Sequence, residues 1–445
     1  MKKKNLTDFK VLGLVAVTFI FMYSGCGKKA PEITWNYSIR EVIRPERGRS
    51  DSIHIDLYID ATKSMSGFAK NTQSIYNKFL EELETTVGVG WKSADIRFFK
   101  FGTKIKEIDR QVFRTSNAEY FYLEPGIFEK TNIDQVINQT DSSRLSVVIT
   151  DLFQTEGDIN SIVQQIKERC FKRGIQVAIL GIKSEFDGWV YDVGPGVVPY
   201  KLKSTGENAD TYRPFYALIF GDPLNIEQLF NNLKSQPFVK EENFLVLSRY
   251  LLNKVDMRLT KSRESRGLNT RSKSKQEQAF EIKLRQEMLF KFDMKKGNNE
   301  GAWDAEITFE RNARTPDFRT EDIELVVYKK SSLPGQKDVS SDSILSDDIT
   351  LNSINREDGR LKAGLGLKLA EPPGNYSYLV YLQCASIDGL LVPQWVKDFS
   401  SPNPSAKNDS YKTLNLGKFI NDLLRANLAI YQPKIAKMYI TIRKL

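Results

Sequence analysis

Oxygen-bearing side chains follow two apolar, strand-like stretches of the sequence. An aspartate ends the stretch 52–60 and hydroxyl residues follow it at steps of two, while a second aspartate closes the stretch 144–151. Together with a threonine that precedes a helix-like segment between them, the set is Asp60, Thr62, Ser64, Thr131 and Asp151. Carboxylate and hydroxyl oxygens, without histidine or cysteine, suit a hard divalent cation such as Mg²⁺, Mn²⁺ or Ca²⁺. Two carboxylates leave room for a third from another molecule.

The segments that must position these side chains alternate between strand-like and helix-like patterns. Apolar runs at 52–60, 144–151 and 175–183 predict buried strands, whereas 66–87 and 158–174 have the spacing of amphipathic helices. This alternation predicts an α/β fold with a doubly wound, mostly parallel sheet. In such a sheet, residues that directly follow the strands meet at one edge, so the oxygen-bearing side chains should converge.

Three short motifs in this region resemble those of von Willebrand factor type A domains. The strings "DATKSMSG", "KTNIDQVI" and "ITDL" occur in the family's order, and the resemblance covers residues 51–236. It implies a metal-ion-dependent adhesion site in which Thr62, Ser64 and Thr131 bind the cation through their hydroxyls. Asp60 and Asp151 would then act largely through bound water. A lone D-x-T-x-S string would be weak evidence, but three motifs in register are specific.

Several positions depart from the family's pattern. Thr62 replaces the usual serine and keeps the hydroxyl, and Leu152 replaces a frequent glycine. Lys63 stands where glycine is common, so its charge would either weaken cation binding or favour an acidic partner. Residues 184–213 are rich in glycine, proline and polar residues and predict an insertion.

Ordinary structural roles compete with cation binding for these residues. All five oxygen-bearing residues could be caps and turns, and Ser66 is predicted to be a helix N-cap with Gly67 permitting close backbone approach. Glu156 and Asp158 on the neighbouring loop are predicted to be rim and cap residues. The single histidine, His54, is predicted to pack in the core, and Cys170 and Cys384 are predicted to be small buried groups.

The first 26 residues predict a lipoprotein-type signal segment. A lysine-rich start precedes an apolar run from Val11 to Tyr23, which has the length of a signal-peptide core and is short for a membrane span. Ser24, Gly25 and Cys26 resemble the end of a bacterial lipoprotein signal with Cys26 lipidated, although Tyr23 holds a place where leucine is usual. The alternative is an uncleaved anchor, and both readings place the chain outside the cytoplasm at a membrane.

The next segment predicts how the anchor connects to the body. Residues 27–50 are polar and predict a tether that lifts the first domain off the membrane. Gly27 is not the aspartate of an inner-membrane retention signal, which favours the outer membrane in an envelope with two membranes.

The second half of the chain has a different pattern. Residues 237–279 predict a helical and basic linker, in which the run 261–275 is read as solvated rather than as a contact with an anionic surface. Residues 280–445 predict a β-sandwich-like domain that includes a late helix at 414–433 and a terminal strand. The net charge of +9, part of it in the signal segment, is too small to indicate nucleic-acid binding.

These features predict a lipid-anchored, extracytoplasmic protein of the bacterial envelope that binds a protein partner through a divalent cation, with a partner carboxylate completing the metal shell. An alternative is a structural or assembly component in which the cation only stabilises the domain. A metal-dependent hydrolase is a third reading, against which no general base is evident near the loops, so we expect no enzymatic activity.

Overall fold

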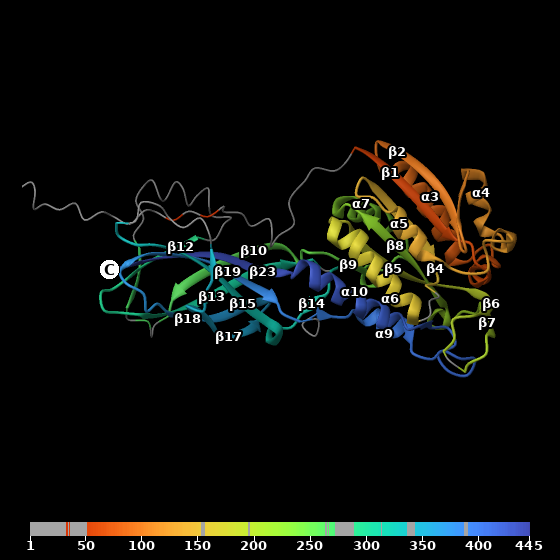
Figure 1. Cartoon of the computed structure of the whole chain (residues 1–445). Helices are drawn as coiled ribbons and strands as arrows, with labels where there is room; N and C mark the ends of the chain where they lie inside the picture. The colour runs from red at the N-terminus through yellow and green to blue at the C-terminus, as the bar shows by residue number, and fades with distance from the viewer. Residues whose placement is uncertain are drawn as a thin grey trace, which may run out of the picture.

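A computed structural model of the 445-residue chain describes residues 33, 35, 51–152, 156–194, 196–262, 265, 267–271, 289–312, 314–335, 343–386 and 390–445. Cys26 with the signal segment, most of the tether, most of the basic run and the side chains of Glu156 and Asp158 lie outside this description. Figure 1 shows an α/β part beside a β-rich part. Among the helices described, none has the length and apolar character needed to cross a membrane.

The α/β part is built on a seven-stranded mixed sheet with the order β3-β2-β1-β4-β8-β5-β9. Its strands are β1 (Ser52–Asp60), β2 (Ser93–Phe101), β3 (Ile105–Ile108), β4 (Arg144–Thr150), β5 (Gln176–Ser184), β8 (Arg213–Gly221) and β9 (Phe244–Leu247). Only β1 pairs in parallel with its neighbours β2 and β4, and the other four pairs are antiparallel.

The prediction that the strands of this sheet pair mostly in parallel is therefore wrong. Two of the four antiparallel pairs are made by β8, which lies between β4 and β5 and is antiparallel to both, and the edge strands β3 and β9 make the other two. The chain reaches β8 from β5 through the small hairpin of β6 (Phe186–Val190) and β7 (Tyr200–Ser204) and a 3₁₀ turn (Ala209–Thr211), not through an α-helix. A return without a crossover helix gives antiparallel pairing. The predicted insertion 184–213 is thus the connection that places β8 inside the sheet.

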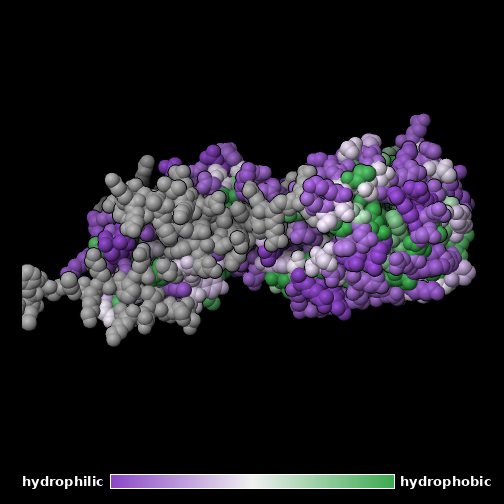
Figure 2. All heavy atoms as spheres, turned by 90° about the horizontal axis from the view of Figure 1, so that it is seen from above, coloured by the Kyte–Doolittle hydropathy of each residue, from purple (hydrophilic) through white to green (hydrophobic). Residues whose placement is uncertain are grey.

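Helices cover both faces of this sheet (Figure 1). On one face lie α2 (Ser66–Ala69), α3 (Ile75–Val89) and α7 (Pro223–Leu233). On the other lie α5 (Ile133–Gln139), α6 (Glu156–Gln165) and α10 (Leu416–Tyr431). A short helix, α4 (Arg110–Arg114), follows β3. The strands are apolar on both faces because both are buried, and Figure 2 accordingly shows mainly hydrophilic residues outside, with smaller hydrophobic patches.

The β-rich part consists mainly of two sheets. One has the order β10-β13-β18-β17, formed by Leu252–Lys261, Glu300–Arg311, Arg360–Lys368 and Ile349–Glu357. The other has the order β11-β12-β23-β19-β15-β16, formed by Leu268–Thr270, Leu289–Met294, Lys434–Lys444, Gly374–Cys384, Ile323–Ser332 and Ile344–Leu345. Both contribute to one apolar cluster, in which the Trp303 and Phe292 ring centroids are 5.3 Å apart. The prediction of a β-rich second part is confirmed.

Shorter elements lie on both parts of the molecule, and two of their residues, Trp395 and Thr413, contact β5 and β8 of the α/β part. Two pairs of two-residue strands are β14 (Asp317–Phe318) with β20 (Leu390–Leu391), and β21 (Ser400–Ser401) with β22 (Thr413–Leu414). Between β20 and β21 lies α9 (Gln394–Phe399).

The predicted boundaries between the two parts need correction. The stretch 237–279, predicted as a linker, contains β9 of the α/β sheet and both β10 and β11 of the β-rich sheets. The late helix α10 packs on the α/β part, where the Tyr431 hydroxyl donates to the Phe171 carbonyl at 2.7 Å. It does so because its apolar side covers the sheet face beside α6, so one apolar cluster runs through both parts.

Trp35 of the predicted tether lies against the β-rich part. The Trp35 indole Nε1 donates to Ser377 Oγ at 2.9 Å, and the Lys330 ammonium lies 4.7 Å from the indole ring centre. The Tyr439 ring centroid is 6.2 Å from that of Trp35. At Trp35 the chain is therefore docked on the sheet formed by β15, β19 and β23.

Cys170 and Cys384 are free, buried thiols, as predicted, and burial raises their pKa values to about 11 and about 12. The prediction for His54 is wrong. It lies near the start of β1, where its ring is exposed and contacts the Asp95 carboxylate on β2 at 2.8 Å.

Candidate metal site

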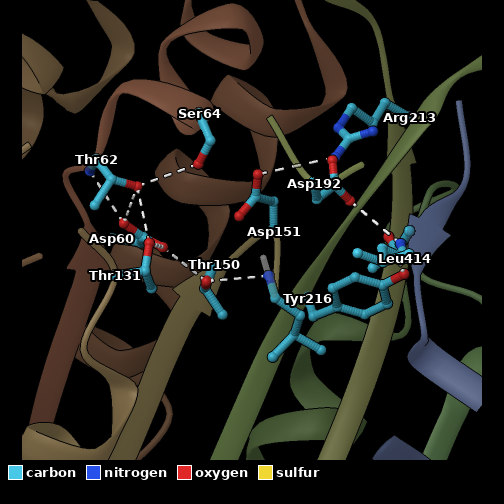
Figure 3. A network of polar contacts seen from close by, with 12 residues as sticks. Asp60, Thr62, Ser64, Thr131, Thr150, Asp151, Asp192, Arg213, Tyr216 and Leu414 are labelled. Atoms are coloured by element: carbon cyan, nitrogen blue, oxygen red, sulfur yellow. Dashed lines mark hydrogen bonds and ion pairs between the residues drawn. The ribbon is translucent and has the colours of Figure 1, made fainter. Parts of the chain in front are cut away.

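The carboxyl ends of β1 and β4 form the floor of the candidate site. The two strands pair in parallel, so Asp60 at the end of β1 lies beside Thr150 at the end of β4. The Thr150 hydroxyl donates to Asp60 Oδ2 at 2.8 Å, and Asp151 is the next residue along the chain. The parallel register thus brings both predicted aspartates to one edge of the sheet (Figure 3).

The loop after β1 folds its hydroxyls back over Asp60. Asp60 Oδ1 accepts from the backbone N–H of Thr62 at 3.0 Å and from its hydroxyl at 2.6 Å. Ser64 Oγ lies 3.2 Å from Thr62 Oγ1. Carboxylates commonly order a following turn by accepting such bonds. Spacing by two therefore places both hydroxyls on the same side of the turn.

Thr131 reaches the site from a separate loop. Its Oγ1 lies 3.1 Å from Thr62 Oγ1 and 3.3 Å from Asp60 Oδ2. The approach depends on Gly102, where an added Cβ would lie 2.0 Å from the Ile127 carbonyl oxygen. The structure thus brings together the predicted residues Asp60, Thr62, Ser64 and Thr131, with Asp151 at the adjoining strand end.

The site is buried, and its electrostatics favour a cation. All five predicted residues are at most 7% exposed. Burial, and to a smaller extent the negative charge of Asp151, raises the pKa of Asp60 to about 7. The hydrogen bonds that Asp60 accepts from Thr62 and Thr150 act in the opposite direction and lower this pKa. A positive ion between the two carboxylates would offset both the burial and the repulsion.

Two further charged residues were not identified from the sequence. Arg213 at the start of β8 and Asp192 after β6 are each 1% exposed and joined by a hydrogen-bonded ion pair. Arg213 Nη2 also lies 4.0 Å from Asp151 Oδ2, and the backbone N–H of Leu414 donates to Asp192 at 3.3 Å. The only sequence signal was an arginine directly before an apolar strand. The composition of 184–213, which predicts an insertion, does not indicate the partners of this arginine.

These residues supply a test of whether a divalent cation fits. Asp60, Asp151, Asp192 and Arg213 sum to a formal charge of −2, and each is at most 1% exposed. Uncompensated buried charge is strongly unfavourable, whereas a dication would neutralise this group. The donor set consists of oxygen atoms, as Mg²⁺ and Ca²⁺ prefer. The residues therefore fit a divalent cation, held by Thr62, Ser64 and Thr131 with the aspartates balancing its charge.

The remaining predicted positions flank this group. Lys63 is exposed on a 3₁₀ turn (Lys63–Met65) beside the site. Ser66 is not the predicted N-cap, since its hydroxyl donates instead to the Lys63 carbonyl at 2.9 Å. Leu152 has φ 55°, a backbone conformation that favours glycine, the residue that the motif resemblance implies at this position. At Gly67 an added Cβ would lie 2.5 Å from the Phe186 ring, so close approach is required as predicted.

In the part of the chain that the structure describes, the candidate site included, no group of three or more histidine, cysteine, aspartate or glutamate side chains is placed to hold a metal ion, so the candidate site depends on two aspartates and on hydroxyl oxygens. A comparison of the chain with models of known families, with curated proteins and with solved structures finds no match. The functional argument therefore depends on the geometry and charge of the site and on the motif resemblance.

Proposed function

We propose that this protein binds a partner protein through a divalent cation held at the edge of the α/β sheet. The observation that supports it most is that the hydroxyl of Thr62 lies within hydrogen-bonding distance of the side chains of Asp60, Ser64 and Thr131, beside Asp151. The order of their motifs resembles that of von Willebrand factor type A domains, in which such a site is used for adhesion. A partner carboxylate would complete the metal shell.

The surroundings agree with an acidic partner. Lys63 is exposed next to the buried carboxylates, so it can attract a partner's acidic side chain without being desolvated in the free protein. We propose no enzymatic activity. The N-terminal sequence supports lipid anchoring at Cys26 and a location outside the cytoplasm in a bacterial envelope, with the outer membrane favoured where there are two.

The first experiment tests cation binding itself. Thermal unfolding of the protein is followed with Mg²⁺ and with chelator, for the wild type and for Asp60→Asn, which keeps the shape of the side chain. Mg²⁺ should raise the melting temperature of the wild type by several degrees and leave the variant unchanged, because binding to the folded state alone stabilises it. An equal shift in both proteins would exclude this site.

The second experiment separates partner binding from a purely structural cation. Proteins captured from membranes with the wild type are compared with those captured with Asp60→Asn, each with Mg²⁺ and with chelator. Proteins that bind the wild type only in Mg²⁺ and do not bind the variant support the proposal. Unchanged capture by a folded Asp60→Asn protein would instead favour a structural or assembly role, in which the cation only stabilises the domain.

A further inference from the structure

The ion pair of Asp192 and Arg213 lies beside the candidate site but belongs to none of its motifs. Both residues come from the segment that inserts β8 into the sheet, and both are 1% exposed. The pair adjoins Asp151, since Arg213 Nη2 lies 4.0 Å from Asp151 Oδ2 (Figure 3). It is therefore close enough to affect a bound cation without contacting it.

Arg213 interacts electrostatically with Asp151 as well as with Asp192. Its Nε and Nη1 are buried and have no hydrogen-bond partner among the described residues. Its guanidinium thus faces two carboxylates, those of Asp192 and Asp151, with one direct hydrogen bond. Charges in a buried environment interact over several ångströms. Arg213 therefore opposes a cation at Asp151, and Asp192 supports one.

We infer that Asp192 and Arg213 set the net charge of the cation site and so its selectivity for divalent ions. This inference rests on the proposed cation binding. With Asp60 and Asp151, the pair leaves a formal charge of −2, which a divalent cation neutralises. A monovalent ion leaves one buried negative charge and a trivalent ion one positive charge, and either is costly in this environment.

The test compares the affinities of Mg²⁺ and Tb³⁺, measured by titration calorimetry on the full-length protein in detergent at pH 8. Asp192→Asn changes the formal charge to −1 and should lower the Tb³⁺ to Mg²⁺ affinity ratio by about tenfold. Arg213→Met changes it to −3 and should raise the ratio by a similar factor. The double variant restores −2 and should return the ratio to within about threefold of the wild type.

A matched control comes from another buried carboxylate, on the strand that ends in Asp60. Asp56 lies on β1, is buried and is paired with Arg97 and Arg144, so Asp56→Asn should leave the ratio unchanged. If Arg213→Met does not fold, Asp192→Asn decides alone, because the amide oxygen can still accept from Arg213. A wild type that binds neither ion would refute the proposed site. A wild type that binds both, with an unaltered ratio in Asp192→Asn, would overturn only the present inference.

Discussion

Leu152 follows the last aspartate of the candidate site in a conformation that leucine rarely adopts. Its φ of 55° costs a residue with a Cβ roughly 1–2 kcal/mol, yet its side chain is buried in the core. Leu152 N–H donates to the Thr150 hydroxyl, which itself bonds Asp60. The turn is therefore stabilised by its hydrogen bond and by the packing of the side chain.

At position 152 glycine should give a more stable protein than alanine, which is the reverse of the usual order of these two residues. Leu152→Gly loses the buried side chain but removes the backbone strain, whereas Leu152→Ala loses most of the side chain and keeps the strain. We expect urea unfolding to rank the free energy of unfolding as wild type, then glycine, then alanine, with the two variants about 1 kcal/mol apart. An alanine variant more stable than the glycine variant would contradict the left-handed turn.

The reactivity of the buried cysteines Cys170 and Cys384 tests how tightly the core around them is packed. Burial raises the pKa of Cys170 to about 11 and that of Cys384 to about 12, so at pH 8 about one thiol in a thousand or fewer is ionised. A disulfide reagent added to the folded protein should modify neither residue, and both should react after unfolding in urea. Rapid reaction of Cys170→Ala protein in the folded state would show that Cys384 is accessible.

Most of the candidate site was predictable from individual residues, because motif spacing and strand ends locate Asp60, Thr62, Ser64, Thr131 and Asp151. Asp192 and Arg213 were not predictable in this way. Their proximity depends on the path of a long irregular connection, which local patterns do not determine.

At the level of elements, the site depends on how closely the loop before α5 approaches the end of β2. Gly102 makes this approach possible, since a Cβ there would overlap the backbone oxygen of Ile127, which cannot rotate away. The loop that carries Thr131 is therefore positioned by backbone contact rather than by a flexible side chain.

Gly102→Ala should accordingly affect both stability and cation binding. We expect a loss of about 1–3 kcal/mol in the free energy of unfolding and a weaker Mg²⁺ affinity, because Thr131 must move away from Thr62. The matched control is Gly88→Ala in α3, where an added Cβ meets no atom within 4 Å. That variant should be neutral or slightly stabilised. If Gly102→Ala and Gly88→Ala had equal effects on urea unfolding and on Mg²⁺ affinity, Gly102 would not position the loop that carries Thr131.

The individual strands and helices were largely predictable, since hydrophobic period distinguishes them. Pairing was not, because a buried apolar strand has the same composition in parallel and antiparallel positions. The apolar sequence of β8 is typical of a strand, but nothing in it specifies a place between β4 and β5.

At the level of the whole molecule, α10 connects the two parts. Its side chains Phe419, Ile420 and Leu423 are at most 4% exposed and belong to the apolar cluster shared by both parts. The backbone N–H of Leu414, just before this helix, also donates to Asp192 beside the candidate site. The late helix was predicted as a unit of the β-rich domain, because periodicity shows which side of a helix is apolar and not which surface covers it.

Leu423→Ala should therefore destabilise the whole protein and not one part of it. We expect a loss of about 2–5 kcal/mol and a single thermal transition, because the shared cluster couples the parts. Arg425→Ala on the exposed side of α10 serves as the control and should change stability by less than about 0.5 kcal/mol. Two separated calorimetric transitions in the leucine variant would show that the parts unfold independently.

The docking of Trp35 on the β-rich part limits how far the protein can extend from a bilayer. With Cys26 as the proposed lipid-bearing residue, Trp35 lies nine residue steps along the chain from the anchor. A fully extended chain of that length spans about 30 Å. The sheet that receives Trp35 would then lie within roughly that distance of the lipid headgroups. The α/β part, at the opposite end of the molecule in Figure 1, would face away from the membrane, where a partner in the surrounding space can reach it.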